Sequence, residues 1–140
     1  MKVAIGSDHA GFEYKSKIIN LLEEVYGAQV LDVGTFSTES VDYPDYAHLV
    51  SKEVIVGADF GVLICGSGNG VSMAANKHKK IRAALCWTPE ISKLARAHND
   101  ANIISLPARF VGVSEAKSII KNFLDTPFEG GRHKRRVEKI

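Results

Sequence analysis

Cys65 stands between an apolar run and a glycine-rich loop, a place where a thiol can do chemistry. Residues 59–64 predict a buried strand, residues 66–70 read Gly-Ser-Gly-Asn-Gly, and residues 71–77 predict the start of a helix. Glycines let the backbone approach a ligand closely, and the free N–H groups of a helix start favour negative charge. Cys65 is therefore a candidate base or nucleophile, with a buried, inert thiol as the alternative. Because a free thiol has a pKa of about 8.5, it needs the helix terminus or a nearby cation to act as an anion at neutral pH.

Four further side chains offer groups for proton transfer or for binding hydroxyls. Three of them lie near predicted strand ends, and the fourth, Tyr43, precedes a predicted helix. Asp8 and His9 follow the first predicted strand, and His98 ends a helix that begins near Pro89 and precedes the fifth strand. We expect His9 and His98 to lie on the same edge of the sheet, and histidine is the side chain best suited to proton transfer near neutral pH. The plainer interpretations are helix capping for Asp8 and His98, and packing for Tyr43.

Arginines near the C-terminus are candidates for holding an anionic group. Arg132 and Arg136 follow the glycine pair at 130–131 and lie four residues apart, so a helix places both guanidinium groups on one face. The planar donor fork of arginine fits a phosphate well. Arg109, after the fifth predicted strand, is a third candidate, and a solvated, charged tail is the alternative interpretation.

Short apolar runs alternate along the chain with amphipathic stretches of helical length. The predicted strands are residues 3–5, 30–33, 62–64, 81–85 and 102–106. The predicted buried faces are Ile18, Leu22 and Val25 in the first helix, and Ala116, Ile119, Ile120 and Phe123 in a helix over residues 114–124. This alternation predicts an α/β three-layer sandwich with a five-stranded, parallel, Rossmann-like sheet. Ligands of such sheets bind beyond the carboxyl ends of the strands.

Composition narrows the classes of protein that remain. The chain has 140 residues, 45% of them hydrophobic, which suits one domain spanning residues 1–140. A formal net charge of +2 does not indicate a nucleic-acid partner. The two cysteines, Cys65 and Cys86, each follow an apolar run and form no disulfide framework or CxxC metal site. We find neither a signal-peptide pattern nor a membrane-spanning run, and we expect a cytoplasmic protein.

The motifs of three common sites are missing. A dinucleotide site needs G-x-G-x-x-G after the first strand, where this chain has Ser7-Asp8-His9. A P-loop needs Gly-Lys followed by Ser or Thr, which does not occur. A cysteine phosphatase loop places an arginine six residues after the thiol, at the position of Val71. The glycine loop therefore points to a site of another kind.

Six segments together carry a resemblance to a known family. In chain order they are residues 7–12, 42–47, 65–70, 74–77, 97–102 and 130–133. They resemble the ribose-5-phosphate isomerase B family, which includes galactose-6-phosphate isomerase subunits, over nearly the whole chain. One branch of that family has a glutamate where Val71 stands and lacks the cysteine, so the chain resembles the cysteine type.

The resemblance implies that the chain interconverts ribose 5-phosphate and ribulose 5-phosphate through an enediolate, without a metal or an organic cofactor. It implies that Cys65 moves a proton between C1 and C2, that His98 helps to open the sugar ring, and that Asp8 assists. The loop with Ser67 would stabilise the oxyanion. The other implied substrate contacts are His9, Tyr43, Gly66, Gly68, Asn69, Gly70, Asn99, Arg109, Arg132 and Arg136.

The same resemblance implies self-association and leaves the substrate open. Family members place their active sites between subunits, so we expect a homodimer or homotetramer with a sugar phosphate as ligand, and no nucleic acid or membrane as partner. A hexose 6-phosphate, such as allose or galactose 6-phosphate, is the alternative substrate. The depth of the pocket decides between a pentose phosphate and a hexose phosphate. A phosphosugar-binding protein without catalysis is a further alternative.

Overall fold

Five parallel strands form one sheet in the order β2-β1-β3-β5-β4. The computed structural model describes residues 1–140. The strands are β1 (Lys2–Ser7), β2 (Gln29–Asp32), β3 (Phe60–Cys65), β4 (Ala83–Leu85) and β5 (Ile103–Pro107). The five predicted strands and their parallel arrangement are confirmed. Because Ser7 of β1 is level with Ile64 of β3, the segments that follow these two strands leave the sheet side by side.

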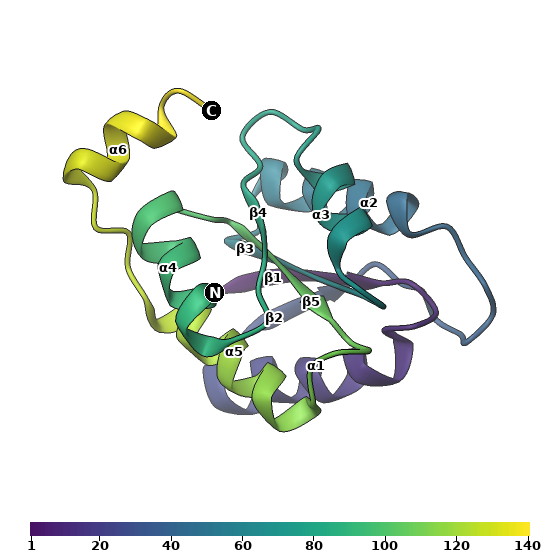
Figure 1. Cartoon of the computed structure of the whole chain (residues 1–140). Coiled ribbons are helices and arrows are strands. Elements are labelled where there is room, and N and C mark those ends of the chain that lie inside the picture. The colour runs from purple at the N-terminus through teal and green to yellow at the C-terminus, as the bar shows by residue number, and fades with distance from the viewer.

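Helices cover both faces of this sheet, which confirms the three-layer sandwich (Figure 1). One face carries α1 (Phe12–Tyr26), α4 (Pro89–Asn99) and α5 (Val113–Asp125), and the other carries α2 (Tyr43–Val56) and α3 (Asn69–Ala75). The last helix, α6 (Gly131–Val137), packs beside α4. None of these helices is both long and apolar enough to cross a membrane.

Each face of the sheet has its own apolar core, because strand side chains alternate between the two faces. Val62 and Ile64 belong to the core under α1, α4 and α5, whereas Leu63 and Cys65 belong to the core under α2 and α3. The thiol therefore points toward the start of α3, into which its own strand leads.

The predicted buried faces of the helices are confirmed, with one difference in α1. Ala116, Ile119, Ile120 and Phe123 are the buried residues of α5, as predicted. In α1, Val25 lies in the last turn, where the apolar stripe runs out past the core, and it is 57% exposed. Lys15 is instead buried on this helix, where its Nζ pairs with Asp32 at 2.5 Å and donates to the carbonyl of Thr35 at 2.7 Å. This buried cation ties α1 to the segment that leaves β2.

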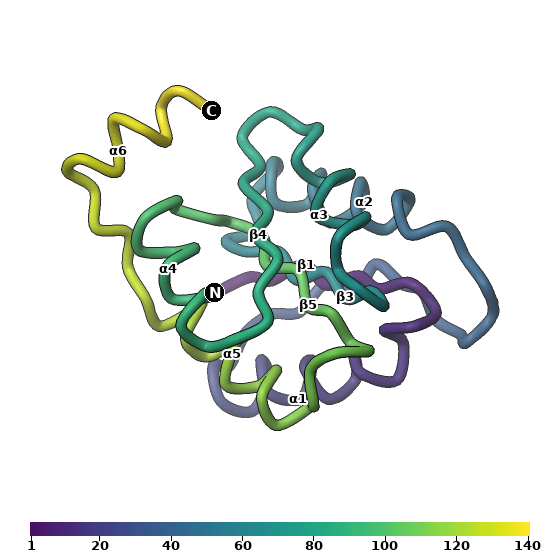
Figure 2. The backbone as a smooth tube through the Cα atoms, in the orientation of Figure 1, coloured from purple at the N-terminus to yellow at the C-terminus, as the bar shows by residue number.

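The connection from β2 to α2 extends past the carboxyl ends of the strands (Figure 2). It lies beside the turn after β1, since the N–H of Val41 donates to Nδ1 of His9 at 3.2 Å. Polar loops from three parts of the chain thus meet at the carboxyl edge, where parallel sheets bind ligands.

Candidate active site

The thiol of Cys65 donates a hydrogen bond to Oδ2 of Asp8, with 3.0 Å between sulfur and oxygen. The two residues lie 57 positions apart in the chain and meet because β1 and β3 are neighbours. The other carboxylate oxygen of Asp8 accepts the N–H groups of Ala10 and Gly11 at 3.0 and 3.2 Å. Asp8 thus shapes the turn before α1 without capping the helix, whose N-cap residue is Gly11 and has no side-chain cap, so the capping interpretation is wrong. Its other oxygen faces the thiol.

Cys65 is held as a thiol rather than a thiolate. Burial, followed by the hydrogen bond to Asp8 and its negative charge, raises the pKa of Cys65 to about 11. The N–H groups of Gly68 and Gly66 lower this pKa, but they do not outweigh the other causes. Neither a cation nor the start of α3 therefore lowers the pKa of Cys65 enough to make it a thiolate. The sulfur instead keeps its proton and donates it in the hydrogen bond to Asp8.

The pH dependence of thiol alkylation tests this pairing. In the wild type, the rate of reaction of Cys65 with iodoacetamide should rise about tenfold per pH unit and level off near pH 11, because only the thiolate reacts. Asp8→Asn removes the acceptor charge and should make the thiol react about tenfold faster at pH 8. Cys86 is fully buried with a pKa raised to about 12, so it should stay unmodified in both proteins. A wild-type profile that levels off near pH 8.5 would contradict the thiol–carboxylate pair.

Glycines of the loop after β3 make room for two side chains from elsewhere in the chain. A Cβ atom on Gly70 would lie 2.5 Å from the ring of Tyr43, and one on Gly66 would lie 3.2 Å from Nε of Arg109. Gly68 has a φ of +74°, in the left-handed region, and a Cβ there would lie 2.5 Å from Leu85. The loop therefore comes close to Tyr43 on one side and Arg109 on the other.

His9 joins the same edge with one nitrogen already engaged. Because Nδ1 accepts the N–H of Val41, a neutral His9 carries its proton on Nε2 and can donate it. We call the residues gathered here the carboxyl-edge group. Its members are Asp8, His9, Tyr43, Cys65, Gly66, Ser67, Gly68, Asn69, Gly70 and Arg109.

The expectation that His9 and His98 share one edge of the sheet is wrong. His98 and Asn99 end α4, which runs back along the sheet before β5 begins, so they lie at the amino ends of the strands. The chain between α4 and β5 is hydrogen-bonded to the start of β3, since Gly61 N–H donates to the carbonyl of Asn102 at 2.9 Å. A connecting helix between parallel strands must run opposite to them, which is why its last turn reaches the far edge.

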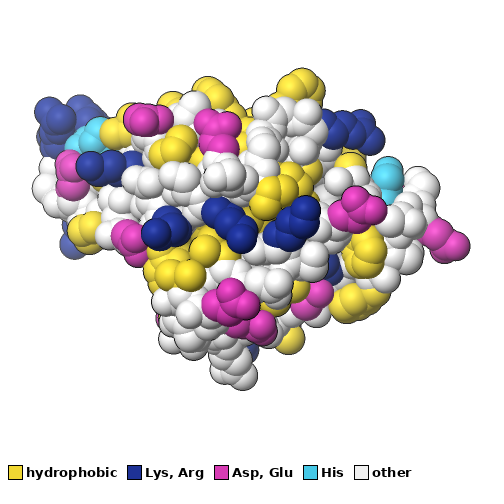
Figure 3. Space-filling view, turned by 90° about the horizontal axis from the view of Figure 1, so that it is seen from below, with side chains coloured by type: hydrophobic (Ala, Val, Ile, Leu, Met, Phe, Trp, Pro, Cys, Tyr) yellow, Lys and Arg dark blue, Asp and Glu magenta, His cyan; other side chains and the backbone are white.

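Arg132 and Arg136 lie at this far side as well, on the helix that the sequence predicts for them. They are four residues apart on α6, which packs beside α4. Figure 3 shows the basic side chains of α6 gathered at one end of the molecule beside a histidine. We call His98, Asn99, Arg132 and Arg136 the amino-edge group. Within one chain, the predicted site residues thus divide into two groups at opposite edges of the sheet.

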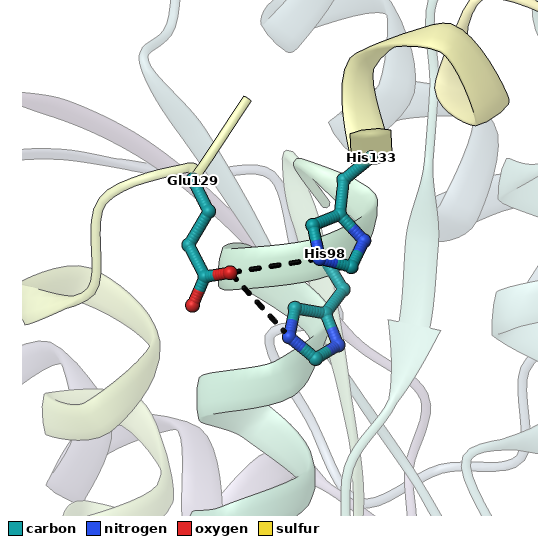
Figure 4. A group of neighbouring side chains, drawn as sticks. All are labelled: His98, Glu129 and His133. Carbon is teal, nitrogen blue, oxygen red and sulfur yellow. Dashed lines mark ion pairs between the residues drawn. The ribbon is translucent and has the colours of Figure 1, made fainter. Parts of the chain in front are cut away.

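Two residues that sequence reasoning did not single out, Glu129 and His133, surround His98. The rings of His98 and His133 are stacked, with centroids 4.1 Å apart and planes within 6°. Oε2 of Glu129 lies 3.7 Å from Nε2 of His98 and 3.5 Å from Nε2 of His133 (Figure 4). The i, i+4 spacing of Glu129 and His133 was the available sequence signal, but nothing in it points to His98.

The ribose/galactose isomerase family matches residues 3–140 of the chain. The chain belongs to this family. Ribose-5-phosphate isomerase B of Escherichia coli is 47% identical over 140 residues, which cover 99% of this chain and 93% of that protein. The family resemblance carried by the six segments is confirmed, and the chain is an isomerase of this family.

Solved structures agree with this assignment. A ribose 5-phosphate isomerase from Thermotoga maritima superposes with a TM-score of 0.95 at 54% identity, covering 99% of this chain and 95% of that one. Ribose-5-phosphate isomerase B from Mycoplasma genitalium, solved with bound ribulose 5-phosphate, gives a TM-score of 0.92 at 44% identity, covering 99% and 92%. The parallel five-stranded sheet is therefore the fold of this family.

Proposed function

We propose that the chain interconverts ribose 5-phosphate and ribulose 5-phosphate through an enediolate, with Cys65 as the base. The observation that carries this proposal is the hydrogen bond from the Cys65 thiol to Asp8, beside a glycine loop at the carboxyl edge of the sheet. The relatives named ribose-5-phosphate isomerase B, and the bound ribulose 5-phosphate of one of them, support the choice of a pentose phosphate.

The thiol–carboxylate pair suggests how the base works although its pKa is raised. As the C2–H bond breaks, its proton passes to Sγ of Cys65 while the thiol proton passes to Oδ2 of Asp8. The electron pair of the C2–H bond forms the C1–C2 double bond, and the carbonyl electrons move onto O1. The proton of the C2 hydroxyl then passes to O1. Sγ returns a proton to C1 while Oδ2 of Asp8 returns the other to the sulfur, which gives the ketose and restores the pair. A positioned acid or base of this kind contributes about 10² to 10⁴ in rate.

The rest of the carboxyl-edge group suits the charge that develops on O1. Peptide N–H groups of the Gly66–Gly70 loop, with Ser67 in it, are the proposed donors to this oxygen. Removing one such donor commonly costs roughly 10² to 10³ in rate. Tyr43, Asn69 and His9 lie around the loop as donors to the sugar hydroxyls or the phosphate, and Arg109 adds a positive charge.

The division of the site residues supports an active site shared by two chains. His98 would open the furanose ring, Asn99 would bind the sugar, and Arg132 and Arg136 would bind the phosphate, yet all four lie away from Cys65 in one chain. A complete site would combine the carboxyl-edge group of one copy with the amino-edge group of a second copy. We therefore propose a homodimer, or a homotetramer built from such dimers.

Turnover measurements decide between this function and its nearest alternative. The family name includes galactose, so a hexose 6-phosphate is the second candidate. We expect kcat/KM for ribose 5-phosphate to exceed that for allose 6-phosphate and galactose 6-phosphate, and a preference for either hexose would overturn the substrate assignment. We also expect the C2 hydrogen of the substrate to exchange with solvent deuterium. Tight binding without exchange would instead indicate a phosphosugar-binding protein.

Arg136→Ala should mainly weaken substrate binding. Hydrogen bonds from charged groups contribute about 1.5 to 3 kcal/mol, so we expect KM for ribose 5-phosphate to rise roughly 10- to 100-fold with a small change in kcat. Arg135→Ala is the matched control, because it removes the same charge from the neighbouring exposed position of α6 and should leave KM nearly unchanged. Equal KM values for the two variants would indicate that Arg136 belongs to a solvated helix.

A further inference from the structure

Glu129 is fixed next to His98 by its backbone as well as its side chain. Its N–H donates to the carbonyl of Ala97 in α4 at 3.0 Å, which ties the segment before α6 to the last turn of α4. Its Oε2 then lies 3.7 Å from Nε2 of His98, a side chain that is 36% exposed. The carboxylate therefore stands on one side of the His98 ring while the other ring nitrogen, Nδ1, is left free of it.

His133 faces the same carboxylate but has no proton to offer it. Nε of Arg132 donates to Nε2 of His133 at 3.5 Å, which leaves the lone pair of that nitrogen engaged. Burial, together with the charges of His98 and Arg132, lowers the pKa of His133, so its ring is neutral. Of the two stacked rings, only His98 can present an Nε2–H to the carboxylate of Glu129, across the 3.7 Å contact.

Two histidines and a glutamate are also the residue types of a zinc site, but the ring geometry does not fit one. A metal ion lies near the plane of each imidazole that binds it. The planes of His98 and His133 are parallel within 6° and their centroids are 4.1 Å apart, so their nitrogen lone pairs run side by side instead of meeting at one point. The arrangement suits a carboxylate that orients one ring and a second ring that supports it from behind.

We propose that Glu129 is a positioning residue for ring opening, which holds the proton of His98 on Nε2 and directs Nδ1 to the sugar, with His133 as the flat surface behind the ring. This inference rests on the proposed function. In the step concerned, the C1–O4 bond of the furanose breaks and its electron pair goes to O4, which takes a proton from solvent. The C1 hydroxyl loses its proton to Nδ1 of His98 and becomes the aldehyde, and His98 then passes this proton to solvent. Glu129 does not touch the sugar.

Two measurements on one variant separate ring opening from the later proton transfer. Glu129→Gln keeps the shape and removes the charge, and we expect kcat for ribose 5-phosphate to fall about tenfold, less than for a buried orienting carboxylate because Glu129 is exposed. Ribulose 5-phosphate cannot form a furanose, because its O5 carries the phosphate. Exchange of its C1 hydrogen with deuterium needs Cys65 but no ring opening, so the variant should keep this rate within about twofold.

Matched variants complete the test. Glu138→Gln removes the same charge at the end of α6, where the carboxylate meets only Lys134 at 3.9 Å, and should leave both rates unchanged. Glu129→Asp should retain more isomerisation than Glu129→Gln, since it keeps the negative charge. Equal losses of isomerisation and exchange in Glu129→Gln, or no loss of either, would overturn the inference. A wild-type protein that does not convert ribose 5-phosphate would instead overturn the proposed function.

Discussion

Cys65→Ala is expected to lower kcat for ribose 5-phosphate by roughly 10³-fold, within the range of about 10² to 10⁴ that a positioned base contributes. KM should change little, because the residues proposed to hold the phosphate and the hydroxyl groups are other side chains. Loss of the thiol also frees the carboxylate of Asp8 from its only side-chain donor, but the two backbone N–H groups that it accepts keep it in place. Steady-state kinetics with both sugar phosphates measures the effect.

Two controls make the result specific to the base. Cys86→Ala removes the other thiol, which is fully buried beside β4 and bonds only to the carbonyl of Ala84, and it should keep kcat near the wild-type value. Calorimetric binding of ribulose 5-phosphate to Cys65→Ala should match the wild type, which shows that the site is intact. If Cys65→Ala keeps activity within tenfold of the wild type, Cys65 is not the base.

The sequence was most informative where chemistry and backbone geometry depend on neighbouring residues. A thiol followed by three glycines in five positions marks the end of β3 without any knowledge of the fold. The apolar stripe of α5 was read correctly for the same reason, since helical spacing is a local property. Local patterns thus predict the strands, the helices and the residues of the carboxyl-edge group.

Contacts between distant segments could not be read in this way. The strand order brings Asp8 to Cys65, and the raised pKa of the thiol follows from that contact and from burial, neither of which has a local signal. Nothing in the sequence around Lys15 sets it apart from the exposed lysines, yet it is buried against Asp32. His98 is different, because the direction of α4 alone places it at the amino edge, and the error came from treating a residue before a strand like one after it.

Mixing two inactive variants should restore activity if the site is shared between chains. Cys65→Ala spoils the carboxyl-edge group, and His98→Asn spoils the amino-edge group, so each protein alone should be nearly inactive. In a mixed dimer, one of the two sites combines an intact Cys65 from one chain with an intact His98 from the other. Random pairing at equal amounts makes half of the dimers mixed, so about a quarter of the wild-type activity should return.

The matched mixture joins Cys65→Ala with Asp8→Asn, whose altered residues meet within one chain at 3.0 Å. Both changes fall in the carboxyl-edge group, so no pairing of these chains builds an intact site, and activity should stay at the level of the single variants. Native mass spectrometry of both mixtures establishes that mixed dimers have formed. If activity returns in the first mixture and not in the matched one, Cys65 and His98 must act from different chains. No recovery despite mixed dimers would mean that the two edges of the sheet do not serve one active site, and the ring-opening role of His98 would then be lost with it.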